Sequence, residues 1–155
     1  ITNTDNQVII LLPYKAPFDW PLMLSFFQSR KMSNIEEISA EYYFRTIELD
    51  DCRGWLKVSQ HESKNALNLT VKLTDYSYLH QVIVRVRRMF DLDADMQIIH
   101  QHLAKHPKLA AVIEQVTGLR LPGCWDIFYS SYLRPTNISK RCNNSGPTHC
   151  GKIWK

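Results

Sequence analysis

The amino-acid sequence predicts an α+β domain, in which two helices cover an antiparallel sheet of four or five strands and short helices follow. Apolar and polar residues alternate in several segments between positions 41 and 73, as in half-buried strands. Segments on both sides of these strands carry apolar residues at spacings of three and four, as in amphipathic helices. Polar clusters, proline and glycine separate the segments and mark the turns.

Length and composition favour one ordinary globular domain, with room for a second only if it is small. The chain has 155 residues, of which 45% are hydrophobic and 22% are charged. No apolar run approaches the roughly 20 residues of a membrane span, and residues 8–12 are too few for a signal-peptide core. We therefore expect a cytoplasmic protein without a membrane partner, and a monomer. Because Ile1 rather than methionine comes first, we also expect a fragment or a processed piece.

The net charge of +4 is concentrated in one segment. Residues 129–155 hold five basic residues and no acid, which leaves 14 basic and 15 acidic residues in 1–128. The main part of the chain therefore has a charge of −1 and is not a basic nucleic-acid binder by composition.

The first strand and the first helix follow each other closely. Residues 7–12 are an apolar run closed by Pro13, typical of a strand. Asp19 is a good N-cap for a helix, and Pro21 lies in the first turn, where its missing N–H costs nothing. One face of this helix carries Trp20, Met23, Leu24 and Phe27, whereas Phe26 lies off it. An aromatic in that position is either a partly exposed packing residue or part of a cleft.

Three strands are predicted next, at residues 41–49, 53–60 and 66–73, and residues 33–39 could add an edge strand. Asp50 and Asp51 form a turn, and residues 61–65 form another. The segment 66–73 shows the clearest alternation, with one apolar face that consists of Leu67, Leu69, Val71 and Leu73.

Three helices are predicted after the strands, at residues 78–90, 96–106 and 109–116. Thr74, Asp75 and Ser77 are candidate N-caps for the first. Its many β-branched residues weaken it by propensity, so packing on the sheet must stabilise it. We interpret its arginines as a solvated face in preference to a phosphate-binding patch: Arg85, Arg87 and Arg88.

The sequence contains no motif that indicates a metal site, a cofactor site or a catalytic residue. The acidic run 91–95 lacks two features of a calcium loop, because Met96 stands at the glycine position and His102 at the closing glutamate. His102 and His106 could share a helix face, but a surface pair is favoured. A set of Cys142, His149 and Cys150 fits no common zinc spacing.

Four segments, in this order, carry a resemblance to a known family: PFDWPLMLSFFQSR at 17–30, EYYFRTIEL with RGWLKV at 41–58, RRMFDLDAD at 87–95 and GLRLPGCWDIF at 118–128. Residues 14–128 resemble the N-terminal domain of the DNA-3-methyladenine glycosylase II family. The resemblance implies a helix-covered antiparallel sheet like half of a TATA-binding protein. It also implies base-excision repair of alkylated bases in double-stranded DNA by the intact relative.

In that family the following domain carries the catalytic aspartate and the helix-hairpin-helix that binds phosphates. The resemblance therefore gives this chain no catalytic residue, and weak or no DNA binding is expected for the fragment. It implies that Phe26 faces the base cleft, with Trp20 as a less favoured companion because Trp20 fits the core. An aromatic there could stack on a cationic alkylated base.

The last segment departs from the family, which continues with a helix of the type IRAILGQQIS where this chain has YSSYLRPTNISKRC. With suitable codons, residues from Arg134 onward read GQQISVKGATTVARRIVEKYG one base over. Residues 129–133 give something close to IRPIL, and the join at Leu133 and Arg134 needs one base resolved. We therefore interpret residues 129–155 as an out-of-frame, disordered tail of a truncated glycosylase.

The expected division is an N-terminal domain at 1–117, a junction at 118–128 and the tail at 129–155. Two other functions stay open. An active enzyme would need a positioned carboxylate such as Asp126, which fits a helix cap better. A stand-alone module could bind nucleic acid or a protein on the open face of its sheet.

Overall fold

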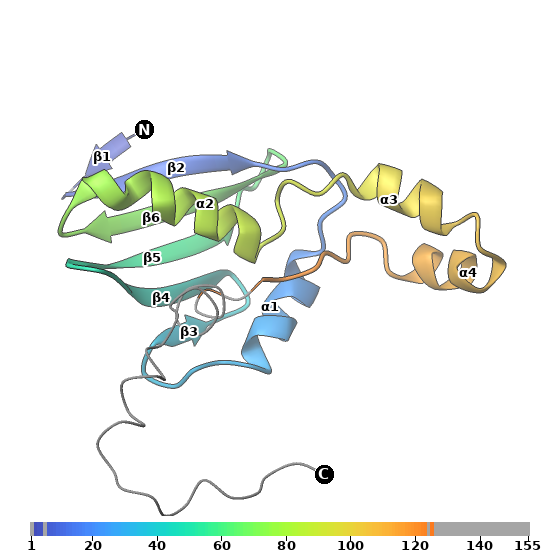
Figure 1. Ribbon diagram of the computed structural model, residues 1–155, viewed down its shortest axis with the longest axis horizontal. Coiled ribbons are helices and arrows are strands. Elements are labelled where there is room, and N and C mark those ends of the chain that lie inside the picture. The colour runs from blue at the N-terminus through green and yellow to red at the C-terminus, as the bar shows by residue number, and fades with distance from the viewer. Residues whose placement is uncertain (1, 5, 124, 126–155) are drawn as a thin grey trace, which may run out of the picture. The chain divides into compact units, whose positions relative to one another are not determined.

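The computed structural model describes residues 2–4, 6–123 and 125. They form an α+β fold, as predicted, with a single antiparallel sheet in the strand order β1-β2-β6-β5-β4-β3 (Figure 1). The strands are β1 (Thr2–Thr4), β2 (Gln7–Pro13), β3 (Glu36–Ile38), β4 (Tyr42–Leu49), β5 (Cys52–Gln60) and β6 (Ala66–Leu73). The helices are α1 (Trp20–Gln28), the 3-10 turn η1 (Tyr76–Tyr78), α2 (Leu79–Met89), α3 (Met96–Leu103) and α4 (Pro107–Gln115).

The core lies between one face of the sheet and the helices α1 and α2. Tyr43, Val58 and Leu69 stand side by side on adjacent strands and are fully buried. The Tyr43 ring meets Phe27 from α1 at 5.1 Å and Phe90, which follows α2, at 5.8 Å. Figure 1 shows α2 lying over one face of the sheet. The four residues of the predicted apolar face of α1 are all buried, which confirms that stripe.

The opposite face of the sheet carries polar and aromatic side chains. Phe44 and Trp55 are half-buried there, with ring centroids 5.7 Å apart. Lys57 follows them in the same face, since it pairs with Phe44 and Thr70. The alternation of β5 and β6 is therefore as the sequence predicts.

One buried ionic contact lies on the otherwise apolar inner face of β4, whose residues alternate in burial. The Arg45 guanidinium lies 3.5 Å from the Glu36 carboxylate, and both side chains are buried. The Tyr43 hydroxyl donates to the same carboxylate oxygen at 2.5 Å, and burial is the main cause that raises the pKa of Tyr43. A buried charge of this kind is stable only when it is paired.

Several boundaries differ from the prediction. Pro107 begins α4 instead of breaking the chain, because proline needs no N–H at the first helical positions. The predicted helix 96–106 ends at Leu103, and the predicted helix 78–90 starts with the 3-10 turn η1, whose N-cap is Asp75. Strand β1 was not predicted, since a short polar segment shows no alternation of apolar and polar residues; it pairs antiparallel with β2.

The chain divides into two compact units, Ile1–Gly123 and Cys124–Lys155. The first unit takes in residues 118–123, the start of the predicted junction. Asp126 and the predicted tail 129–155 lie outside the described residues. Among the residues described, no helix has the length and apolarity that a membrane crossing requires.

Candidate functional site

The candidate site begins at the N-terminus of α1. The Asp19 carboxylate accepts the backbone N–H of Leu22 at 2.9 Å, and Pro21 lies in the first turn, so the predicted cap is confirmed. This geometry fixes which residues of α1 point into the core. Phe26 points elsewhere and stays half-buried, as expected for a residue off the apolar stripe.

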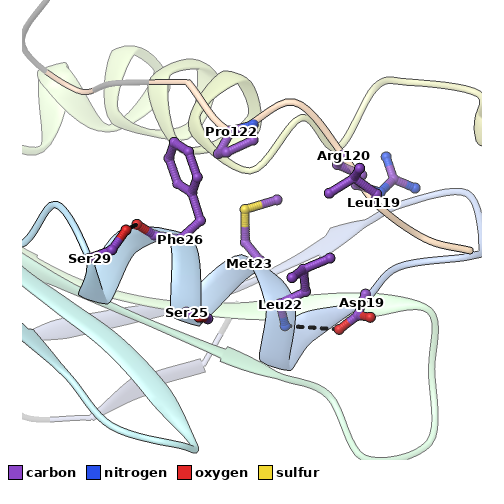
Figure 2. Close-up of a pocket in the computed structure, with 9 residues that line it drawn as sticks. All are labelled: Asp19, Leu22, Met23, Ser25, Phe26, Ser29, Leu119, Arg120 and Pro122. Carbon is purple, nitrogen blue, oxygen red and sulfur yellow. Dashed lines mark hydrogen bonds between the residues drawn. The ribbon is translucent and has the colours of Figure 1, made fainter. Parts of the chain in front are cut away.

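Phe26 lines a pocket of about 240 Å³ between α1 and residues 119–122 (Figure 2). Its wall is mostly apolar, with a few polar groups. The lining residues are Asp19, Leu22, Met23, Ser25, Phe26, Ser29, Leu119, Arg120 and Pro122. An apolar pocket with an aromatic wall and few polar groups is typical of small-molecule sites.

The second wall of the pocket is positioned by two glycines. Gly118 has a φ of +87°, and a Cβ there would lie 2.8 Å from the Asp19 nitrogen. At the other end, the Gly123 N–H donates to the Met89 carbonyl at 2.9 Å. Residues 118–123 thus run close against the backbone of the domain, which only glycine allows at position 118.

Arg120 holds this segment in place from within. Its side chain is only 2% exposed. Its guanidinium donates to the carbonyls of Asp91, at 2.5 Å, and Pro17, at 3.2 Å, and also to those of Lys15 and Ala94. It lies 5.1 Å from the Phe18 ring centroid. Burial lowers the pKa of Arg120, and the nearby Asp91 carboxylate opposes that effect.

The acidic run at residues 91–95, just before α3, also contacts the segment 118–123. Asp95 caps α3 through the Ile98 N–H. Asp91 instead accepts the Leu121 N–H at 3.1 Å, and Asp93 pairs with Arg87. Two of these acids therefore tie other segments together, which local sequence could not indicate.

A second arginine covers the Phe26 ring. The Arg30 guanidinium lies 3.9 Å from the centroid of that ring. Arg30 also donates to the Ser29 hydroxyl at 3.0 Å, and this hydroxyl donates to the Phe26 carbonyl at 2.8 Å. The guanidinium is therefore anchored beside the pocket although the side chain is exposed.

The structure does not bring Phe26 and Trp20 together in this pocket. Trp20 is 4% exposed and stacks on Phe90 at 5.8 Å, within the core. Trp20 also borders a separate hollow that is lined by polar residues such as Glu41 and His61. Phe26 thus borders a pocket, whereas Trp20 packs in the core.

No cluster of three metal-ligating side chains occurs within the part of the chain that the structure describes. His102 and His106 are both exposed. Cys142, His149 and Cys150 lie outside the described residues. Sequence reasoning missed the burial of Arg120 and Arg45, because no periodic pattern distinguishes a buried arginine from a solvated one.

The sequence of this chain is similar to those of known proteins. A family model described as the AlkA N-terminal domain matches residues 9–126. The chain is 29% identical over 117 residues to the "DNA-3-methyladenine glycosylase 2" of Escherichia coli (strain K12), a match that covers 76% of the chain and 39% of the relative. It is 27% identical over 152 residues to a "Probable bifunctional transcriptional activator/DNA repair enzyme AlkA" of Mycobacterium tuberculosis, covering 98% of the chain and 30% of the relative.

The matches thus span less than half the length of these relatives. The family model, in contrast, covers most of the chain and contains α1, the whole of β4 to β6, and the segment that closes the Phe26 pocket. On this evidence the chain belongs to the AlkA N-terminal domain family.

Proposed function

We propose that this chain is the N-terminal domain of a DNA glycosylase that removes alkylated bases, and that its Phe26 pocket forms one wall of the base cleft. The observation that carries the proposal is the position of Phe26, half-buried on the outer side of α1 and open to a pocket. An aromatic ring in an apolar wall suits a flipped base, which such enzymes read by stacking. The names of the similar proteins support the same substrate class.

This domain takes part in substrate binding but not in the chemistry. The pocket contains one carboxylate, that of Asp19, and this group already accepts the Leu22 N–H as a helix cap. Cleavage of a glycosidic bond needs a carboxylate free to face the sugar, so we place catalysis in a following domain. The chain would act in the cytoplasm, as a monomer, with weak or no affinity of its own for duplex DNA.

The sequence of residues 129–155 supports such a following domain in another reading frame. If Leu133 is encoded by CTT, the codons TAT TCG TCC TAT CTT AGG for residues 129–134 read ATT CGT CCT ATC TTA GG one base on. The shifted frame then continues without a break as IRPILGQQISVKGATTVARRIVEKYG. In most shifted codons only the middle base is free, because the flanking bases are set by the residues of this chain; serine, leucine and arginine residues leave further choice.

The encoding DNA tests the frame directly. We expect a CTT codon for Leu133 and an open frame, one base over, that continues beyond the segment. If the codons give no such frame, residues 129–155 are in frame, in keeping with the long mycobacterial match, and this part of the proposal is wrong.

The cleft role of Phe26 is tested in the protein with the frame moved by one base from codon 129. We expect this protein to release alkylated bases from DNA and Phe26→Leu to release them about tenfold more slowly, since one stacking contact contributes about 1–3 kcal/mol. Leu22→Ala, on the same pocket wall, serves as the control for shape. The original chain should release none; release that is lost in Asp126→Asn would overturn the non-catalytic assignment.

The aromatic face of the sheet favours a second candidate, an interaction module for single-stranded nucleic acid. Phe44 and Trp55 lie together there, and the Lys57 ammonium lies 4.2 Å from the Tyr42 ring centroid. Aromatic and basic residues on a sheet suit stacking on bases. Salt-dependent binding of an oligonucleotide that Trp55→Thr removes would support this candidate, and its absence at low salt would exclude it.

A further inference from the structure

We propose that the sheet face turned away from α1 and α2 holds one nucleotide of a single strand, with the base on Trp55 and the two flanking phosphates on Lys57 and Lys72. The inference deepens the second candidate function above and rests on it, and it does not depend on the pocket beside α1. The starting observation is where these side chains stand. Trp55 and Lys57 lie two positions apart on β5 and so share a face, and Lys72 is the cross-strand partner of Trp55 on β6.

The indole of Trp55 is the ring on this face that is left for a base. Phe44 packs against it with ring centroids 5.7 Å apart and an interplanar angle of 34°, which supports the indole. Tyr42 is already engaged, because the Lys57 ammonium lies 4.2 Å from its ring centroid and its hydroxyl donates to Glu37. The Tyr42 ring thus holds the ammonium in place without neutralising it. Stacking on an aromatic ring suits any base, since every base has a π face.

The two lysines carry positive charge that no described carboxylate pairs with. Lys57 and Lys72 are both exposed, and neither forms an ion pair within the described part of the chain. The carboxylates of neighbouring strands are engaged with other groups, because Glu48 pairs with Arg53 at 3.0 Å and Glu37 accepts a tyrosine hydroxyl. Two free ammonium groups beside an aromatic ring complement phosphates and a base together.

The spacing of the two lysines suits the two phosphates of one nucleotide. Lys57 pairs with Thr70, and Lys72 lies two positions further along β6 on the same face, so the lysines are diagonal neighbours. Diagonal neighbours in an antiparallel sheet lie about 7–8 Å apart, and long lysine side chains can adjust this to the separation of consecutive phosphates. Trp55 stands at the corner between them, so a base on the indole has a lysine within reach of each of its phosphates.

Thymidine 3′,5′-bisphosphate tests the inference, because it carries one base and both flanking phosphates. It is titrated into the full chain, and the indole N–H signal of Trp55, assigned by its loss in Trp55→Phe, reports binding by NMR. We expect the bisphosphate to bind about threefold more tightly than either thymidine monophosphate, the size of one exposed ion pair. The abasic sugar bisphosphate should bind about tenfold more weakly, since it loses the stacking contact.

Lys57→Met and Lys72→Met each remove one charge and leave the indole in place. Each variant should lower the affinity for the bisphosphate to that of a monophosphate. For a labelled oligothymidylate, each should also reduce the slope of log affinity against log salt by about 0.7, the contribution of one phosphate contact. Lys31→Met removes an exposed lysine between α1 and β3, and this control should change neither quantity.

The outcomes separate this inference from the functions proposed above. If the oligothymidylate binds and Trp55→Thr removes binding, but neither lysine variant weakens the bisphosphate more than the control does, the inference is overturned and the second candidate stands. If neither ligand binds at low salt, both are overturned, and the role of Phe26 is unaffected. A hexaglutamate peptide that binds as tightly as the bisphosphate would indicate a protein-binding face and would also overturn the inference.

Discussion

The backbone N–H of Asp19 donates a hydrogen bond to the carbonyl of Gly118 at 3.1 Å. This bond ties the start of α1 to the segment that closes the pocket. Asp19 takes part twice, because its carboxylate also caps the helix through Leu22. The Phe26 pocket therefore depends on a contact between the start of α1 and residue Gly118.

Gly118 should be intolerant of any side chain. Its φ of +87° strains an L-residue, and a Cβ would approach the Asp19 nitrogen to 2.8 Å. We expect Gly118→Ala to lower the free energy of unfolding by about 2 kcal/mol, measured by urea denaturation. The neighbouring exposed Thr117→Ala is the control, with a change within about 0.5 kcal/mol. Equal effects of the two substitutions would contradict the role of Gly118.

Arg120 should contribute more to stability than an exposed arginine. Arg120→Met leaves four backbone carbonyls without their donor, so we expect a loss of about 3 kcal/mol in the free energy of unfolding. Arg120→Lys should recover little, since an ammonium cannot reach carbonyls on both sides. Arg88→Met, on the exposed side of α2, should change stability by less than about 0.5 kcal/mol.

The two adjacent phenylalanines of α1 should differ in their effects. Phe27 is buried against Tyr43 and Phe90, so Phe27→Ala should cost about 3–5 kcal/mol. Phe26 is half-buried at the pocket, and Phe26→Ala should cost only about 1 kcal/mol. Thermal and urea unfolding of both variants measure the difference, and a Phe26 effect as large as that of Phe27 would place Phe26 in the core.

The ionised carboxylate of Asp95 should stabilise the domain, and this contribution should be lost in acid. The hydrogen bond from Lys15 is the largest cause that lowers the pKa of Asp95, followed by the backbone N–H of Ile98. A lowered folded-state pKa adds stability above the unfolded-state pKa, and that stability is lost as the pH falls through the folded-state pKa. Unfolding measured from about pH 6 to pH 2 should therefore show a shallower decline for Asp95→Asn, which still caps α3. Lys15→Met should give a smaller change in the same direction, and an unchanged slope in both variants would contradict the assignment.

Local patterns in the sequence were sufficient for most of the elements. The apolar stripe of α1, with Asp19 as its cap, is formed as predicted, and β6 begins and ends at the predicted residues. Such elements follow from neighbours three, four or two positions apart, which one segment contains by itself. The same reasoning placed Phe26 outside the core, and the family resemblance assigned it to a cleft.

Features that depend on distant segments were not accessible in this way. Strand β1 exists through pairing with β2, and the burial of Arg45 depends on Glu36 of another strand. An arginine in a sequence carries no sign of its partners, since its long side chain can reach solvent or a buried acceptor equally well.

The sequence by itself determined the α+β class, the order of the helices and strands, the family and the candidate residue Phe26. The tertiary structure alone decided what faces Phe26: residues 119–122, held by Gly118 and Arg120, and the guanidinium of Arg30. The physical reason is that periodicity reports only which side of an element is apolar. The surroundings of a side chain are set by hydrogen bonds and close contacts between segments far apart in the chain.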